Sequence, residues 1–207
     1  MLLKTLLNAF FPPVCPVCSD RIDEAGKLCP RCFGRLVFVA GNTKRQGSAV
    51  VYDETSRRLI LALKYGDRLD LAPLLARLMY NAGRDVLADA DALAAVPLHW
   101  KRMFSRKYNQ AAVLAAELSK LSGVPCYPEM LERIKSTPKQ GTRKERFENV
   151  DKAFISNPDF PVREKTVVLI DDVVTTGATA QACASVLLKN GAKEVRLLTF
   201  AKAQNGC

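Results

Sequence analysis

The chain has 207 residues, with 31 lysines and arginines against 21 acids and a formal net charge of +10. A hydrophobic content of 48% and a charged content of 25% are ordinary for a globular protein and exclude a disordered or fibrous class. The positive charge predicts attraction to polyanions such as nucleic acid, anionic lipid or phosphorylated ligands, although a merely solvated basic surface would have the same composition.

The N-terminal segment MLLKTLLNAFFPP carries apolar residues at helical spacing and ends at Pro12 and Pro13. It is too short for a signal peptide and has no small-residue cleavage site, so the sequence predicts a cytoplasmic protein. No later segment is long enough to span a membrane. We expect this segment to pack against the body of the protein, with peripheral contact to a membrane surface as the alternative.

Two Cys-x-x-Cys pairs follow, separated by ten residues: Cys15 with Cys18, and Cys29 with Cys32. This spacing predicts a structural zinc site, because two such turns supply four thiolates in a tetrahedron and replace a missing apolar core. Disulfides are disfavoured without an export signal, and an iron–sulfur cluster is the other alternative. The module could also serve as a surface for a protein partner.

A polar stretch, Ala40–Ser48, marks the junction between the two predicted domains, residues 1–42 and residues 43–207. The second domain alternates apolar strands with helices, which predicts an α/β fold with a parallel sheet covered by helices on both faces. Strands are expected at 49–52, 90–97, 124–127, 166–170 and 194–200, and helices at 55–64, 70–82, 109–121 and 179–190.

The strand at 166–170 ends in Asp171 and Asp172, and a loop of small and hydroxylated residues follows. Glycine and alanine would let backbone N–H groups close around a phosphate at the start of the next helix. The two acids could accept hydrogen bonds from ribose hydroxyls and hold hydrated Mg²⁺. A generic strand-to-helix turn is the alternative. The loop residues assigned to the phosphate are Thr175, Thr176, Gly177, Ala178 and Thr179.

Two basic segments add cations. The first, Lys101–Lys107, holds four basic residues and no acid, and the second, Arg133–Arg146, holds six with Glu145 as the single acid. The first precedes a predicted helix, so its side chains could offset a pyrophosphate, with Lys64 adding a further cation or serving as an ordinary helix-end charge. The residues assigned to pyrophosphate are Lys64, Arg102, Arg106 and Lys107.

The two acids and the Thr-Gly loop resemble the type I phosphoribosyltransferases. That resemblance implies binding of phosphoribosyl pyrophosphate (PRPP), its 5′-phosphate on the loop, its ribose on the acids and its pyrophosphate neutralised by Mg²⁺. With Pro97, Tyr108-Asn109-Gln110, Ala153-Phe154 and the cysteine pairs, nearly the whole chain resembles the competence protein F (ComF) family. Residues expected in the hood over the site, or in contact with nucleic acid, are Tyr108, Asn109, Arg133, Gln140, Arg143, Lys144, Arg146 and Asn149.

The family resemblance implies a PRPP-binding protein that handles single-stranded DNA in natural transformation, without settling whether a transfer reaction occurs. The alternative is an active phosphoribosyltransferase of nucleotide metabolism with no DNA role. The basic composition of the insertion at Arg133–Asn149 favours the first interpretation, because a nucleobase site would need an aromatic hood. Lys107 and Lys152 stand where the family usually has glycine, and a lysine at 107 disfavours the left-handed backbone conformation that glycine would permit in the pyrophosphate loop.

Overall fold

The computed structural model describes residues 12–98, 108–134, 153–160 and 162–204. Several predicted residues therefore lie outside the described part of the chain. They are the apolar N-terminal segment, Arg102, Arg106, Lys107, Gln140, Arg143, Lys144, Arg146 and Asn149.

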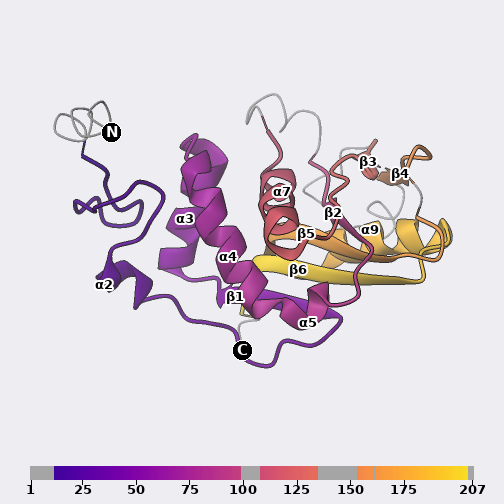
Figure 1. Cartoon of the computed structure of the whole chain (residues 1–207), viewed down its shortest axis with the longest axis horizontal. Helices are drawn as coiled ribbons and strands as arrows, with labels where there is room; N and C mark the ends of the chain where they lie inside the picture. Colours follow the sequence, from indigo (N-terminus) through magenta and orange to yellow (C-terminus); the bar gives the residue numbers. More distant parts are fainter. Residues whose placement is uncertain (1–11, 99–107, 135–152, 161, 205–207) are drawn as a thin grey trace.

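A four-stranded parallel sheet forms the centre of the main domain (Figure 1). Its strands, in spatial order, are β1 (Gln46–Val51), β6 (Glu194–Lys202), β5 (Thr166–Val174) and β2 (Ala92–Ala95). The two inner strands are the longest and are buried along most of their length, as expected for a parallel sheet. The predicted α/β fold is confirmed.

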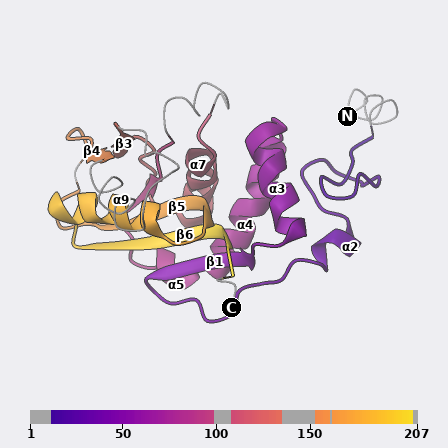
Figure 2. The same ribbon diagram turned by 180° about the vertical axis from the view of Figure 1, so that it is seen from behind.

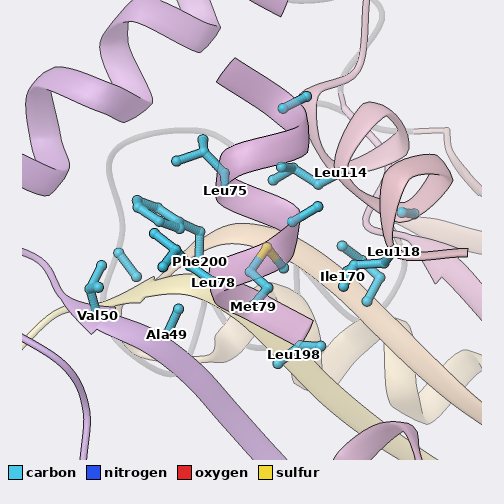
Figure 3. Close-up of a cluster of buried hydrophobic side chains, with 14 of the residues drawn as sticks. Ala49, Val50, Leu75, Leu78, Met79, Leu114, Leu118, Ile170, Leu198 and Phe200 are labelled. Carbon is cyan, nitrogen blue, oxygen red and sulfur yellow. The ribbon is translucent and has the colours of Figure 1, made fainter. Parts of the chain in front are cut away.

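One face of the sheet is covered by α3 (Glu54–Tyr65), α4 (Ala72–Ala82) and α7 (Gln110–Ser122). A 3₁₀ turn at Leu69–Leu71 leads into α4, and the short α5 (Arg84–Leu87) follows it. The larger apolar core lies here (Figure 3), and its labelled members are Ala49, Val50, Leu75, Leu78, Met79, Leu114, Leu118, Ile170, Leu198 and Phe200.

The opposite face carries α9 (Ala178–Lys189) and the antiparallel pair β3 (Leu131–Arg133) and β4 (Phe154–Ser156) (Figure 2). A second apolar core lies between them and the sheet. Among the helices of the described residues, none is long and apolar enough to cross a membrane.

Two predicted boundaries differ from the structure. The strand expected at 124–127 is a single parallel bridge between Cys126 and Leu93. Pro125 and Pro128 lack the N–H groups that a longer ladder would need. In the other direction, β5 continues past its predicted end to Val174, because Val173 and Val174 keep their register with β6. Both acids consequently lie inside the strand, rather than after it.

The cysteine module, with its short helix α2 (Pro30–Phe33), is attached to the main domain at several points. Arg58 of α3 donates to the carbonyl of Val17 at 2.8 Å, and Val17 packs against the larger core. Gly26 lies so close to Asp70 that a Cβ at Gly26 would stand 2.4 Å from the carbonyl oxygen. The boundary at residue 42 stays a prediction.

Candidate functional site

A cavity of about 370 Å³ opens at the carboxyl ends of β1, β2 and β5, where ligands bind in open α/β sheets. Helices α3 and α7 and the β3–β4 pair contribute the remaining walls. Its lining is polar and charged around a few apolar groups, with Tyr52, Lys64, Val96, Pro97, Leu98, Asn109, Gln110, Ala111, Arg133, Asp171, Asp172, Val173, Thr175 and Thr179 on its surface.

The two acids are adjacent in β5, so their side chains point to opposite faces of the sheet. Asp172 forms an ion pair with Lys64 at the end of α3, and both side chains are largely buried. Asp171 lies on the other face, near Cys183 of α9. Burial, reinforced by the negative charge of Asp172, raises the pKa of Asp171 well above its usual range. The pair therefore presents one carboxylate in contact with a lysine ammonium beside one that is held closer to its neutral form.

The loop after β5 has the geometry of a phosphate cradle. Gly177 adopts φ 76°, which favours glycine, and it is the N-cap of α9 with no side-chain cap bond. The first N–H groups of the helix therefore lack a strong internal partner, since Thr176 Oγ1 accepts from the Ala178 N–H only at 3.4 Å. The loop also lines a recess of about 50 Å³ together with Asp171.

A second helix begins at the same cavity. Asn109 caps α7, accepting from the Ala111 N–H at 3.0 Å and donating to the Val96 carbonyl at 3.1 Å. Its amide therefore fixes the start of α7, and the neighbouring Gln110 is buried against the cavity. The amino ends of α7 and α9 both bring positive partial charge to this space, which favours an anion with more than one phosphate group.

Tyr108 links the wall of the cavity to α3, the helix that carries Lys64. Its hydroxyl donates to the carbonyl of Leu63 at 2.5 Å, immediately before Lys64 in α3. The residue expected as a hood or nucleic-acid contact therefore holds α3 against the start of α7. This bond helps to keep the Lys64 ammonium at Asp172.

The four thiols of the module are brought together as predicted. The Sγ atoms of Cys15, Cys18, Cys29 and Cys32 all lie within 4.8 Å of one another, and those of Cys18 and Cys29 are 3.7 Å apart. Four sulfurs at 2.3 Å from a zinc ion would be separated by about 3.8 Å. The donor set and its spacing therefore fit zinc, with no protein position left open for a substrate.

The thiols also differ in acidity. Burial by itself would raise the pKa of Cys15, but N–H groups of Cys29, Val17 and Cys18 outweigh it and lower that pKa to about 6. Burial raises the pKa of Cys32 to about 12. A metal cation at the cluster would favour loss of the Cys32 proton, as in a thiolate metal site.

Lys64, Arg133, Asn109, the acids and Thr175 and Thr179 are thus brought together around one cavity. Thr176, Gly177 and Ala178 lie in the adjoining recess, and Tyr108 supports the wall without lining the cavity. Sequence reasoning missed Tyr52, which follows β1 and lies at the mouth of the site. The signal for it was available, because the residue after any parallel strand belongs to the same edge of the sheet.

Two family models match separate parts of the chain. Residues 6–50 match the model of the double zinc ribbon domain, and residues 107–206 match that of the phosphoribosyl transferase domain. Among solved structures, orotate phosphoribosyltransferase from Aeropyrum pernix is 22% identical, with a TM-score of 0.40, covering 70% of this chain and 76% of its own. The chain therefore combines a region similar to a double zinc ribbon domain with a parallel α/β domain similar to the phosphoribosyl transferase domain.

Two curated relatives extend over nearly the whole chain. Competence protein F of Haemophilus influenzae is 32% identical, covering 92% of this chain and 85% of the relative. The DNA utilization protein YhgH of Escherichia coli K12 is 30% identical, covering 89% and 88%. The chain belongs to the competence protein F family.

The raised pKa of Asp171 predicts a pH-dependent gain in stability for Asp171→Asn. At low pH the Asp171 carboxyl is protonated in both the folded and the unfolded chain, so its burial does not reduce the free energy of unfolding. As the pH rises through the unfolded and then the folded pKa, the carboxyl must ionise while buried, and the folded state is destabilised. We expect the variant to be more stable than wild type at pH 7 by roughly 1 kcal/mol or more, with no gain below about pH 4. Denaturant unfolding at several pH values measures this, with Asp159→Asn at an exposed turn as the control. An equal gain at all pH values would contradict it.

Proposed function

We propose that the cavity binds PRPP together with Mg²⁺. The observation that carries this proposal is the meeting, in one space, of an acid pair, a Thr-Gly loop and two helix amino ends. The 5′-phosphate would lie on the loop at Thr175–Thr179, and the ribose hydroxyls would donate to Asp171 and Asp172. Lys64 and the start of α7 would face the pyrophosphate.

The acid pair suits Mg²⁺, which prefers carboxylate oxygens and keeps several of its waters. Asp171 and Asp172 would hold the hydrated ion, and the ion would supply charge neutralisation for the pyrophosphate. Binding would also favour the ionised form of Asp171, since a nearby cation opposes the effect of burial and of Asp172. The chain's own part would be to position the ribose hydroxyls at Asp171 and Asp172.

We further propose that the protein handles single-stranded DNA. The name of the relative from Escherichia coli, DNA utilization protein YhgH, links that relative to DNA. The net charge of +10 and the basic segments at 101–107 and 133–146 support this role. The alternative, a nucleotide-metabolism transferase without a DNA role, gains no support from those relatives. A cytoplasmic location and contact of the N-terminal segment with a membrane stay predictions.

For the cysteine cluster we propose one structural zinc ion per chain, held by Cys15, Cys18, Cys29 and Cys32. The module is so poor in apolar residues that metal binding would supply much of its folding energy. Metal analysis of purified protein should find one equivalent of zinc, and Cys15→Ser should lose it, whereas Cys183→Ser at a buried cysteine of α9 should keep it. Zinc far below one equivalent in wild-type protein never exposed to chelator would rule the site out.

PRPP binding should depend on the acids and on Mg²⁺. Loss of one charge-assisted contact costs about 1.5–3 kcal/mol, so the double variant Asp171→Ala, Asp172→Ala should bind PRPP at least tenfold more weakly. Calorimetry with Mg²⁺ and with EDTA measures this, and Asp159→Ala serves as the control. Equal affinities of the double variant and wild type would show that the ligand binds elsewhere.

Binding of single-stranded DNA should be sensitive to salt. Each phosphate contact releases counterions, so the logarithm of the affinity should fall with the logarithm of salt by roughly 0.7 per contact. Reversing Arg143, Lys144 and Arg146 to glutamate should reduce both the affinity and this slope. Fluorescence anisotropy of a labelled oligothymidylate measures both.

The control for this experiment reverses Arg163, Lys165 and Lys193, which change the net charge equally at the amino ends of β5 and β6. The control should keep most of the affinity. Absence of binding by wild-type protein at low salt, where electrostatic attraction is greatest, would refute the DNA role.

A further inference from the structure

An aromatic ring stands at the mouth of the cavity, on the side of β1. Tyr52 directly follows the last residue of this strand, lines the cavity and is 37% exposed. Among the described residues that line the cavity, it is the only one with an aromatic side chain. The described walls therefore present a single aromatic surface to a ligand.

The backbone on both sides of Tyr52 is held in place. The Tyr52 N–H donates to the Lys202 carbonyl at 2.8 Å, which continues the pairing of β1 with β6. Asp53 caps α3, because its carboxylate accepts from the Ser56 N–H and Ser56 Oγ accepts from the Asp53 N–H, both at 2.8 Å. Ser56 Oγ also donates to the Val51 carbonyl at 2.9 Å. The attachment point of the ring is thus fixed, and stacking on it requires little ordering of the backbone.

The ring and the acid pair lie at the same edge of the sheet, with one strand between them. Strand β6 separates β1 from β5 (Figure 1), so two strand spacings, about 10 Å, lie between the strand that ends at the ring and the strand that carries the acids. The proposed pyrophosphate position is at the start of α7, which packs on β2 and β5. A second ligand that approaches the ribose from the other side therefore comes from β1 and passes Tyr52.

Resting on the proposed PRPP site, we propose that the ring of Tyr52 stacks against a planar heterocycle of a second ligand, which makes Tyr52 a specificity-determining residue of this cavity. Every nucleobase has a π-face, and stacking on an aromatic side chain adds affinity that depends little on which base is present. A free nucleobase and a base of single-stranded DNA supply the same ring, and the test distinguishes these two sources.

The test separates stacking from charge and from the tyrosine hydroxyl. The probes are free 2-aminopurine, whose fluorescence is quenched by stacking, an oligothymidylate that carries one 2-aminopurine, and a labelled, fully abasic oligomer of the same length and charge. Fluorescence quenching and anisotropy are titrated with and without saturating Mg²⁺ and PRPP. The proteins are wild type, Tyr52→Phe, Tyr52→Leu and, as the control, Phe33→Leu, which removes an exposed aromatic ring of the cysteine module outside the lining of this cavity.

Wild type, Tyr52→Phe and Phe33→Leu should quench at least one of the two 2-aminopurine probes, and Tyr52→Leu should bind that probe about five- to a hundredfold more weakly. Affinity for the abasic oligomer should not differ between wild type and the two Tyr52 variants. Thermal unfolding is measured on each variant, and Tyr52→Met replaces Tyr52→Leu if the latter does not fold. Equal affinities of wild type and Tyr52→Leu for both base-containing probes would overturn the proposal, as would an equal loss in Tyr52→Phe, since the contact would then be the hydroxyl.

Calorimetry of PRPP binding by the same proteins separates this inference from the proposed function. A wild-type protein that binds PRPP without quenching either probe would refute the stacking alone, whereas a wild-type protein that does not bind PRPP would refute the PRPP site. A Tyr52-dependent effect on free 2-aminopurine alone would support stacking and identify the second ligand as a small heterocycle. An effect on the oligothymidylate alone would support stacking and identify the ring as a base of single-stranded DNA.

Discussion

The structure depends on how two adjacent carboxylates are accommodated inside a central strand. A parallel strand sends neighbouring side chains to opposite faces, so each acid of β5 enters a different environment. On one face the ammonium of Lys64 compensates Asp172, and this places the end of α3 at the carboxyl edge of the sheet. Asp171 forms no ion pair within the described part of the chain, and burial together with the charge of Asp172 raises its pKa. Stability and the proposed binding of Mg²⁺ and PRPP therefore make opposite demands on Asp171.

The position of Lys64 is itself the result of two supports. Tyr108 holds the last turn of α3 from the α7 side, and Arg58 links the same helix to Val17 of the zinc ribbon. The helix that reaches the acids is thus packed between the small module and the cavity. This arrangement gives the zinc ribbon a structural connection to the site, although none of its cysteines lines the cavity.

Features formed by residues close together in the sequence could be predicted. Contacts that depend on the order of the strands in the sheet could not. The β-branched run before Asp171, the Thr-Gly loop and the cysteine spacing can each be recognised from neighbouring residues alone. In the structure the run forms β5, the loop leads into α9, and the four thiols lie within 4.8 Å of one another. The ion pair between Lys64 and Asp172 and the place of Tyr52 depend on which strands are neighbours, which periodicity does not state. The prediction of a strand at 124–127 was wrong because it gave more weight to the apolar residues than to the prolines. The β3–β4 pair was missed because each of its strands has three residues, too few to show a periodic pattern.

The residues just before the polar junction also cover the outer edge of the sheet. Val37–Val39 run antiparallel to β1, with N–H to carbonyl bonds from Val39 to Ala49 at 3.1 Å and from Val51 to Val37 at 2.7 Å. These bonds occupy backbone groups that an outer strand would otherwise offer to any passing chain. A protein shortened to residues 43–207 would expose this edge of the sheet, and we expect it to self-associate. Residues that precede the main domain therefore protect its edge strand β1 from pairing with other chains.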